Sequence, residues 1–222
     1  MALACLCAGN YQSLMTIRGS SADALDLAWH KKFIMTYIVE PFTCLLIKKF
    51  YCNSHYTEQR VISDVFAYKR LPFVYNFWDD TDARAHARMS RETLNLSEDD
   101  IVIVSTGRIT RDKGFSLYCE IVESVLSQVG SVKFLLIGDG SYLETVKSRL
   151  SNYIEQGSVL CLGFRDDVSE INLLADVYLN PSLHETLSIS TMEAMSAGLA
   201  AVVTDDGGLK ELVVEGESGF KC

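Results

Sequence analysis

The stretch IVIVSTG, residues 101–107, decides the fold, because it joins an uninterrupted apolar run to a loop of small residues. An apolar strand of this kind is typical of a parallel sheet covered by helices on both faces. A helical pattern follows over residues 115–129, and VKFLLIGDG at 132–140 repeats the strand and its loop. We therefore expect strands and helices to alternate from residue 101 onward.

The rest of the chain continues this alternation. Ser141 and Glu144 form a capping box at the start of an expected helix over 141–152. Gly198 suits the left-handed position that ends a helix. The further expected elements are strands at 158–163, 176–182, 199–205 and 218–222, and helices over 168–175, 189–196 and 209–214. Right-handed crossovers then predict an α/β fold with a Rossmann-like, doubly wound parallel sheet.

The first part of the chain predicts a smaller strand, helix and strand unit. The expected elements are strands at 13–17, 50–53 and 72–77, a long helix over about 22–49, and a helix that Ser54 caps and that runs to about residue 66. The stretch from Asp79 to Asp100 is polar and charged. It is the best linker candidate in the sequence.

Composition bounds the function. The 222 residues suit one domain, or one domain with part of another. A net charge of −9 argues against a general nucleic-acid binder, which needs a basic surface. Seven scattered cysteines without a CxxC pair indicate reduced thiols and a cytoplasmic protein. The apolar N-terminus has no basic segment, which argues against a signal peptide. The longest apolar stretch, 33–47, is too short to span a membrane. The lysines on both sides of it leave contact with a membrane surface open.

The loop after the strand at 101–106 offers groups for an anion. Ligands of doubly wound sheets bind at the carboxyl ends of the strands. Gly107 permits a close approach of the backbone, and Arg108 and Lys113 supply positive charge for phosphate oxygens. Gly114 precedes a helix whose N-terminus favours anions. The alternative is a solvated loop with incidental charges.

Two later loops carry further candidates. Gly138 and Gly140 form either a tight turn beside a ligand or a simple turn before a helix. Glu185 precedes an expected helix and Glu193 lies within it, and carboxylates accept hydrogen bonds from sugar and ribose hydroxyls. The N–H groups of residues 186–190 can face a phosphate. The alternative is that both glutamates only complement the helix dipole.

These motifs together resemble the retaining GT-B glycosyltransferases of family 4. The resemblance covers residues 102–220 and rests on GRxxxxKG at 107–114, GDG at 138–140, Glu185 and Glu193 within HETLSISTMEAMSAG at 184–198, and DDGGLKELVVEGESGF at 205–220. It implies transfer of a sugar from a nucleotide-diphosphate sugar to a saccharide, lipid-linked or other hydroxyl acceptor, with retention of configuration. No metal or other cofactor is implied, and the Asp80-Thr81-Asp82 sequence, a metal motif of another glycosyltransferase fold, lies in the expected linker.

The resemblance also implies residue roles. Arg108 and Lys113 are expected to clamp the diphosphate and Glu185 to lie beside the donor sugar, which makes these three the catalytic candidates. Glu193 is expected to hold the ribose hydroxyls. The remaining donor-binding candidates are Gly107, Gly138, Gly140, Phe164, Arg165, His184, Thr186, Leu187, Ser188 and Ile189. Leu187 and Ser188 replace a Phe and a Gly of the family pattern.

By the same resemblance, residues 1–78 are the remnant of an acceptor-side Rossmann-like domain and 79–98 the linker. Residues 99–222 are then a nucleotide-sugar-binding domain that stops before its closing helices. Two other functions stay open. One is a non-catalytic sugar-nucleotide-binding module or partner subunit. The other is a GT-B sugar-nucleotide epimerase, which would lack the paired glutamates.

Overall fold

The chain divides into two compact units. A computed structural model describes residues 14–17, 29–34, 38, 49–61, 75–76 and 89–222. One unit comprises Met1–Asn76 with His184–Leu187, and the other comprises Phe77–Leu183 with Ser188–Cys222. The second unit contains the main sheet.

The main sheet has six parallel strands in the order β5-β4-β3-β6-β7-β8. This is the strand order of the Rossmann fold, and the direction of winding reverses between β3 and β6. The strands are β3 (Ile101–Thr106), β4 (Val132–Ile137), β5 (Val159–Gly163), β6 (Val177–Asn180), β7 (Ala200–Val203) and β8 (Gly219–Lys221). The predicted doubly wound sheet is confirmed.

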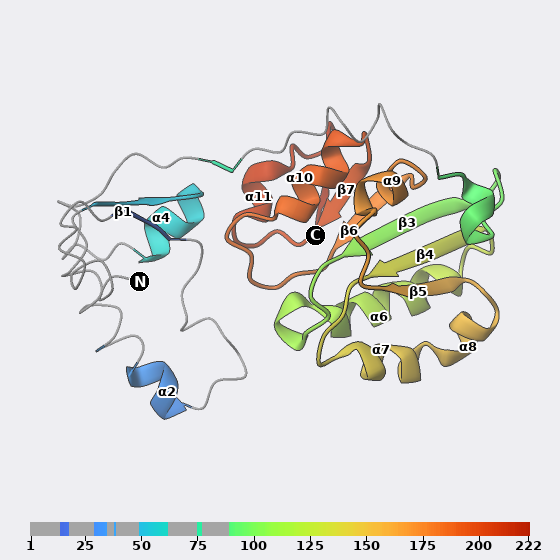
Figure 1. Cartoon of the computed structure of the whole chain (residues 1–222), viewed down its shortest axis with the longest axis horizontal. Coiled ribbons are helices and arrows are strands. Elements are labelled where there is room, and N and C mark those ends of the chain that lie inside the picture. Colours follow the sequence, from blue (N-terminus) through green and yellow to red (C-terminus); the bar gives the residue numbers. More distant parts are fainter. Residues whose placement is uncertain (1–13, 18–28, 35–37, 39–48, 62–74, 77–88) are drawn as a thin grey trace. The chain divides into compact units, whose positions relative to one another are not determined.

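Helices cover both faces of this sheet (Figure 1). One face carries α6 (Phe115–Leu126), α7 (Leu143–Arg149) and α8 (Ser151–Glu155), and the other carries α9 (Val168–Asn172), α10 (Ile189–Ser196) and α11 (Leu209–Leu212). Strand residues alternate between the two cores. Phe134 and Leu136 belong to a buried cluster with Tyr118 of α6, whereas Leu135 belongs to a second cluster with Ile171 of α9.

The helix bounds show which local signals prevail. Helix α10 occupies the predicted range 189–196, and Gly198 behind it has the predicted left-handed backbone, with φ 97°. The expected helix over 141–152 is instead two short helices, and the capping box is wrong. Helix α7 begins at Leu143 without a side-chain cap. The Tyr142 N–H donates to the Ile109 carbonyl (2.9 Å), and Glu144 accepts a bond from Lys147 (2.9 Å).

The end of the predicted linker packs on the second unit. Leu94, in a short 3-10 helix (Arg91–Leu94), and Leu96 are buried in the α9 and α10 core. The Arg91 guanidinium donates to the Asp100 carbonyl (2.9 Å) and pairs with the Asp176 carboxylate (3.0 Å). Residues 89–98 are therefore anchored on the sheet, while 79–88, with the Asp80-Thr81-Asp82 motif, lie outside the described residues.

The first unit contains a parallel pair of strands, β1 (Leu14–Ile17) and β2 (Lys49–Cys52), and the helices α2 (Trp29–Ile34) and α4 (His55–Val61). The predicted cap of α4 is confirmed, because Ser54 Oγ accepts a hydrogen bond from the Thr57 N–H (3.1 Å). The helix expected over 22–49 is wrong at its end, since Lys49 begins β2. Tyr75 and Asn76, expected in a strand, are not in one. Among the described helices, none has the length and apolar character needed to cross a bilayer.

Candidate functional site

The carboxyl ends of β3 and β6 lie side by side at the reversal of the sheet. The two strands pair directly, with Ile103 opposite Val177 and Val104 opposite Tyr178. Their following loops, 107–114 and 181–188, therefore leave the sheet together. In doubly wound sheets this position forms the ligand crevice, because adjacent loops turn in opposite directions there.

Glycines let these loops approach through their backbones. A β-carbon on Gly114, which has φ +73°, would lie 1.7 Å from the Pro181 carbonyl oxygen, so the loop after β3 contacts the loop after β6 at this point. A β-carbon on Gly138 would likewise lie 1.9 Å from the Gly107 carbonyl oxygen. Gly140 approaches the Ile109 carbonyl in the same way, at 2.3 Å. These glycines pack the loops against one another, which sequence reasoning did not foresee.

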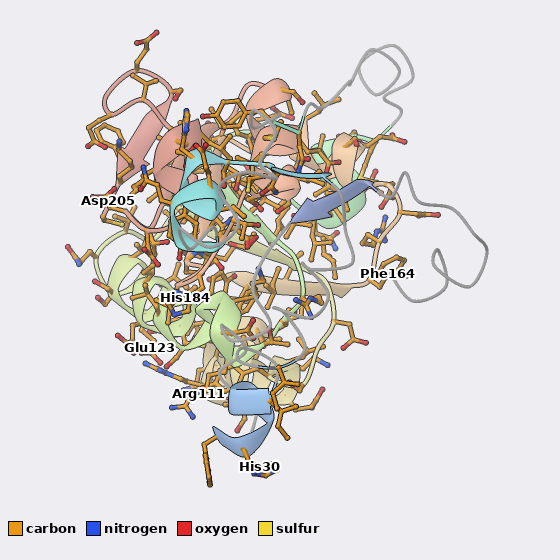
Figure 2. The ribbon with its side chains drawn as sticks, turned by 90° about the vertical axis from the view of Figure 1, so that its left-hand side faces the viewer. His30, Arg111, Glu123, Phe164, His184 and Asp205 are labelled. Atoms are coloured by element: carbon orange, nitrogen blue, oxygen red, sulfur yellow. The ribbon has the colours of Figure 1, made fainter. Side chains whose placement is uncertain are left out.

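The loop after β3 carries the two predicted diphosphate contacts. Arg108 is exposed, and Lys113 is half-buried at the end of a 3-10 helix (Arg111–Lys113). Between them Ile109 is fully buried and its N–H donates to the Asp139 carbonyl (2.9 Å), which anchors the loop. Arg111, labelled in Figure 2, is exposed on the same loop. The loop thus presents cationic side chains from a fixed backbone, an arrangement that suits an anion.

A buried amide, missed by sequence reasoning, fixes the start of α10. Asn180 at the end of β6 donates to Ser188 Oγ (3.2 Å) and to Thr191 Oγ1 (3.0 Å), and its oxygen accepts from the Ser182 N–H (3.1 Å). Ser188 Oγ also caps α10 by accepting from the Thr191 N–H (3.2 Å). The only sequence signal was a polar residue at the end of an apolar strand, directly before Pro181.

The N-terminus of α10 retains donors for a ligand. The cap occupies the Thr191 N–H, while within the described part of the chain the Ile189 and Ser190 N–H groups have no protein acceptor. Tyr178 OH donates to Ser190 Oγ (2.9 Å), which ties the first turn of α10 to β6. First-turn N–H groups and the helix dipole together favour an anionic ligand. The Ser188 and Ile189 predicted for donor binding lie at this helix start.

Glu193 lies one turn further along α10 and faces α9. Its Oε1 accepts a hydrogen bond from Ser169 Oγ of α9 (2.7 Å), and both side chains are partly buried. Carboxylate oxygens accept several hydrogen bonds each, so Glu193 retains capacity for ligand hydroxyls.

The loop after β5 presents the other predicted contacts, Phe164 and Arg165. The Phe164 side chain is 84% exposed on this loop (Figure 2). The Arg165 guanidinium instead forms a two-point ion pair with the Asp167 carboxylate, with an Nε to Oδ1 distance of 2.7 Å. This bond raises the pKa of Arg165 and lowers the pKa of Asp167. Arg165 therefore braces the loop at the start of α9.

Residues 184–187 belong to the first unit. In the sequence they directly precede Ser188, the N-cap of α10. They include Glu185 and Thr186, which are half-buried, and Leu187, which is buried. His184, also half-buried, is labelled in Figure 2. The second unit thus contains Arg108, Lys113 and Glu193, whereas Glu185 belongs to the first unit.

Comparison with known proteins agrees with this architecture. The sequence model described as "Glycosyl transferases group 1" matches residues 87–222, more than half of the chain. The chain belongs to the group 1 glycosyltransferases. This membership and the Rossmann-like fold confirm the coarser part of the resemblance, a GT-B glycosyltransferase of group 1.

The chain is similar in sequence to proteins of Bacillus anthracis and Schizosaccharomyces pombe. It is 27% identical over 156 residues to N-acetyl-alpha-D-glucosaminyl L-malate synthase of Bacillus anthracis, covering 69% of the chain and 40% of that protein. It is 27% identical over 183 residues to the phosphatidylinositol N-acetylglucosaminyltransferase gpi3 subunit of Schizosaccharomyces pombe, covering 81% of the chain and 39% of that protein. The chain thus spans about two fifths of the length of these relatives.

A solved structure shares the fold over the whole chain. The crystal structure of Anabaena Alr3699/HepE in complex with UDP-glucose matches with a TM-score of 0.79 at 18% identity, covering 100% of this chain and 60% of that one.

Proposed function

We propose that this chain provides the donor site of a retaining glycosyltransferase that uses a nucleotide-diphosphate sugar. The observation that carries the proposal is the contact of the Arg108–Lys113 loop, through Gly114, with the loop that leads into α10. The contact fixes cationic side chains and the start of a helix at the same reversal of the sheet. A diphosphate is the ligand class that suits both.

In the proposed reaction, cationic side chains and the start of α10 stabilise the departing diphosphate. The acceptor hydroxyl oxygen forms a bond to the anomeric carbon while the bond from that carbon to the diphosphate oxygen breaks. Arg108 and Lys113 stabilise the charge on the departing diphosphate, as do the first N–H groups of α10. A leaving-group oxygen takes the acceptor proton, and attack on the face that the diphosphate leaves retains the configuration. The proposal requires no metal.

Two carboxylates complete the proposed site. Glu193 accepts hydrogen bonds from the ribose hydroxyls and Glu185 lies beside the donor sugar. UDP is the first nucleotide to test, because HepE of Anabaena was crystallised with UDP-glucose. The proposed acceptor is a hydroxyl of a saccharide or of a lipid-linked molecule. The free state of Cys52, Cys119, Cys161 and Cys222 is in keeping with a proposed cytoplasmic location.

A second candidate function is a non-catalytic module that binds a sugar nucleotide. The composition of the second unit favours it, because this unit contains the predicted nucleotide contacts Arg108, Lys113 and Glu193 but not Glu185, the residue expected beside the donor sugar. Turnover separates the two functions. A chain that binds the nucleotide sugar but neither hydrolyses nor transfers it would establish the module.

Calorimetric titration of the chain with UDP, ADP and GDP tests the donor site. We expect Lys113→Ala and Glu193→Ala each to weaken the tightest of these complexes. Lys147→Ala is the matched control, because Lys147 lies on α7 and pairs with Glu144. Equal affinity in the wild type and in both site variants would show that the site assignment is wrong.

A further inference from the structure

We infer that Ser169 is a positioning residue, which orients the Glu193 carboxylate toward the ribose hydroxyls of the bound nucleotide. The inference rests on the proposed function, and it adds a residue from α9 to a site otherwise built from the loop after β3 and from α10.

The contact joins two helices that are separate in the sequence. Ser169 Oγ donates to Glu193 Oε1 at 2.7 Å, the usual distance of a well-formed bond between a hydroxyl and an acceptor oxygen. Bonds to an ionised acceptor are stronger than bonds between neutral groups. Ser169 therefore holds one carboxylate oxygen of Glu193 in a fixed direction.

Helices α9 and α10 pack against the same buried core beside this contact. Ile171 of α9 and Ala194 of α10 are both fully buried in one core cluster. The ion pair of Arg165 with Asp167 braces the turn that leads into α9, two residues before Ser169. Ser169 thus sits on a backbone that packing and an ion pair fix, which makes its hydroxyl a defined anchor.

An anchored carboxylate binds a ligand at lower entropic cost. A glutamate side chain has several rotatable bonds, and immobilising such a side chain on binding opposes association. Ser169 restricts these bonds before the ligand arrives. Among the residues that the structure describes, no other side chain bonds to the Glu193 carboxylate, so Oε2 and the second lone pair of Oε1 can accept from a ligand. Loss of the Ser169 hydroxyl should then weaken only those ligands that use Glu193.

The alternative is a bond that merely connects α9 to α10. The two roles differ in one measurable respect. If the bond is only structural, its loss should weaken the binding of all nucleotides alike. If it positions Glu193, its loss should weaken only those nucleotides that have ribose hydroxyls.

The experiment measures affinity by calorimetry for the tightest-binding diphosphate of UDP, ADP and GDP, and for its 2′,3′-dideoxy form. We expect Ser169→Ala to weaken the ribonucleotide by about fivefold, the effect of one net hydrogen bond, and to leave the dideoxy nucleotide unchanged. Ser169→Thr, which keeps the hydroxyl, should retain wild-type affinity. The Ser169→Ala, Glu193→Ala double variant should bind as weakly as Glu193→Ala alone.

Controls separate this inference from the proposed function. Ser127→Ala removes a hydroxyl that bonds only within its own turn, to the Ser124 carbonyl, and should change neither affinity. If the wild type binds none of the diphosphates, both proposals fail. If Lys113→Ala weakens binding but Glu193→Ala does not, the donor site stands, and the roles of Glu193 and Ser169 are overturned. If Glu193→Ala weakens binding but Ser169→Ala does not, or weakens both nucleotides equally, only the role of Ser169 is overturned.

Discussion

Gly114 and Pro181 lie in direct backbone contact, although they belong to loops after different strands. A β-carbon on Gly114 would be 1.7 Å from the Pro181 carbonyl oxygen and 2.6 Å from its carbon. Gly114 also has φ +73°, in the left-handed region. The contact fixes the loop that carries Arg108 and Lys113 against the segment that leads into α10. A change at Gly114 should therefore affect both the stability of the chain and the proposed ligand site.

Gly114→Ala should therefore destabilise the chain and weaken nucleotide binding. The left-handed backbone costs about 1–2 kcal/mol for a residue with a β-carbon, and displacement of the Pro181 peptide adds about 1–3 kcal/mol. Urea unfolding gives the loss of stability, and calorimetry with the tightest-binding diphosphate gives the loss of affinity.

Gly157→Ala is the matched control for this prediction. Gly157 has a similar backbone, φ +69°, but a β-carbon there would meet no atom within 4 Å. We expect it to cost only the backbone strain and to leave nucleotide affinity unchanged. If both variants lose equal stability, the contact with Pro181 contributes nothing.

Asn180→Ala should release the start of α10. The amide of Asn180, which is 8% exposed, bonds to Ser188 and Thr191, so its removal leaves both hydroxyls without this partner. We expect a loss of about 1–3 kcal/mol of unfolding free energy and weaker nucleotide binding. Asn152→Ala, at an exposed position of α8, is the control. Unchanged affinity in a folded Asn180→Ala variant would contradict a role for this network in the site.

The sequence predicted those features that depend on neighbouring residues. Strand and helix alternation follows from apolar patterning, and the end of α10 follows from Gly198, which has the predicted left-handed backbone. The Ser141 capping box is wrong, and the sequence could not show that the Tyr142 N–H beside it donates to the Ile109 carbonyl, because that carbonyl is distant in the chain. The same reason hid the contact of Gly114 with Pro181 and the bond of Ser169 to Glu193, since each joins segments that meet only after the sheet has formed.

For the site residues, the sequence likewise predicted the place of each residue along the chain but not its contacts. Arg108 and Lys113 lie in the loop after β3, and Glu193 lies in α10, the helix after β6, as the order of strands, loops and helices in the sequence implied. Arg165, expected to bind the donor, forms an ion pair with Asp167. The sequence contained a signal for this pair, because Asp167 lies only two residues after Arg165. The roles of all these residues toward a ligand stay predictions until binding is measured.

Asn172 offers a test of buried polarity in α9. Its side chain is fully buried, and within the described part of the chain neither its amide nitrogen nor its oxygen has a hydrogen-bond partner. Burying an amide without partners costs free energy, so Asn172→Leu, of similar volume, should be neutral or should raise the melting temperature. Asn172→Ala should lower it by leaving a cavity. A large loss of stability in Asn172→Leu would show that the amide has a partner after all.

The ion pair of Arg165 with Asp167 should give a stability difference that depends on pH. Arg165 lowers the pKa of Asp167 in the folded chain below its value in the unfolded chain. The stabilisation is therefore complete above the unfolded pKa, about 3.9 for an aspartate, and is lost as the pH falls through the lower folded pKa. Because both side chains are partly exposed and solvent screens the pair, Arg165→Ala should lower the free energy of unfolding only slightly at pH 7. Urea unfolding of both proteins from pH 7 down to acid should show this gap closing, and in an Asp167→Asn background it should be absent at every pH. A gap that persists in acid would mean that Arg165 stabilises the turn through packing rather than through its charge.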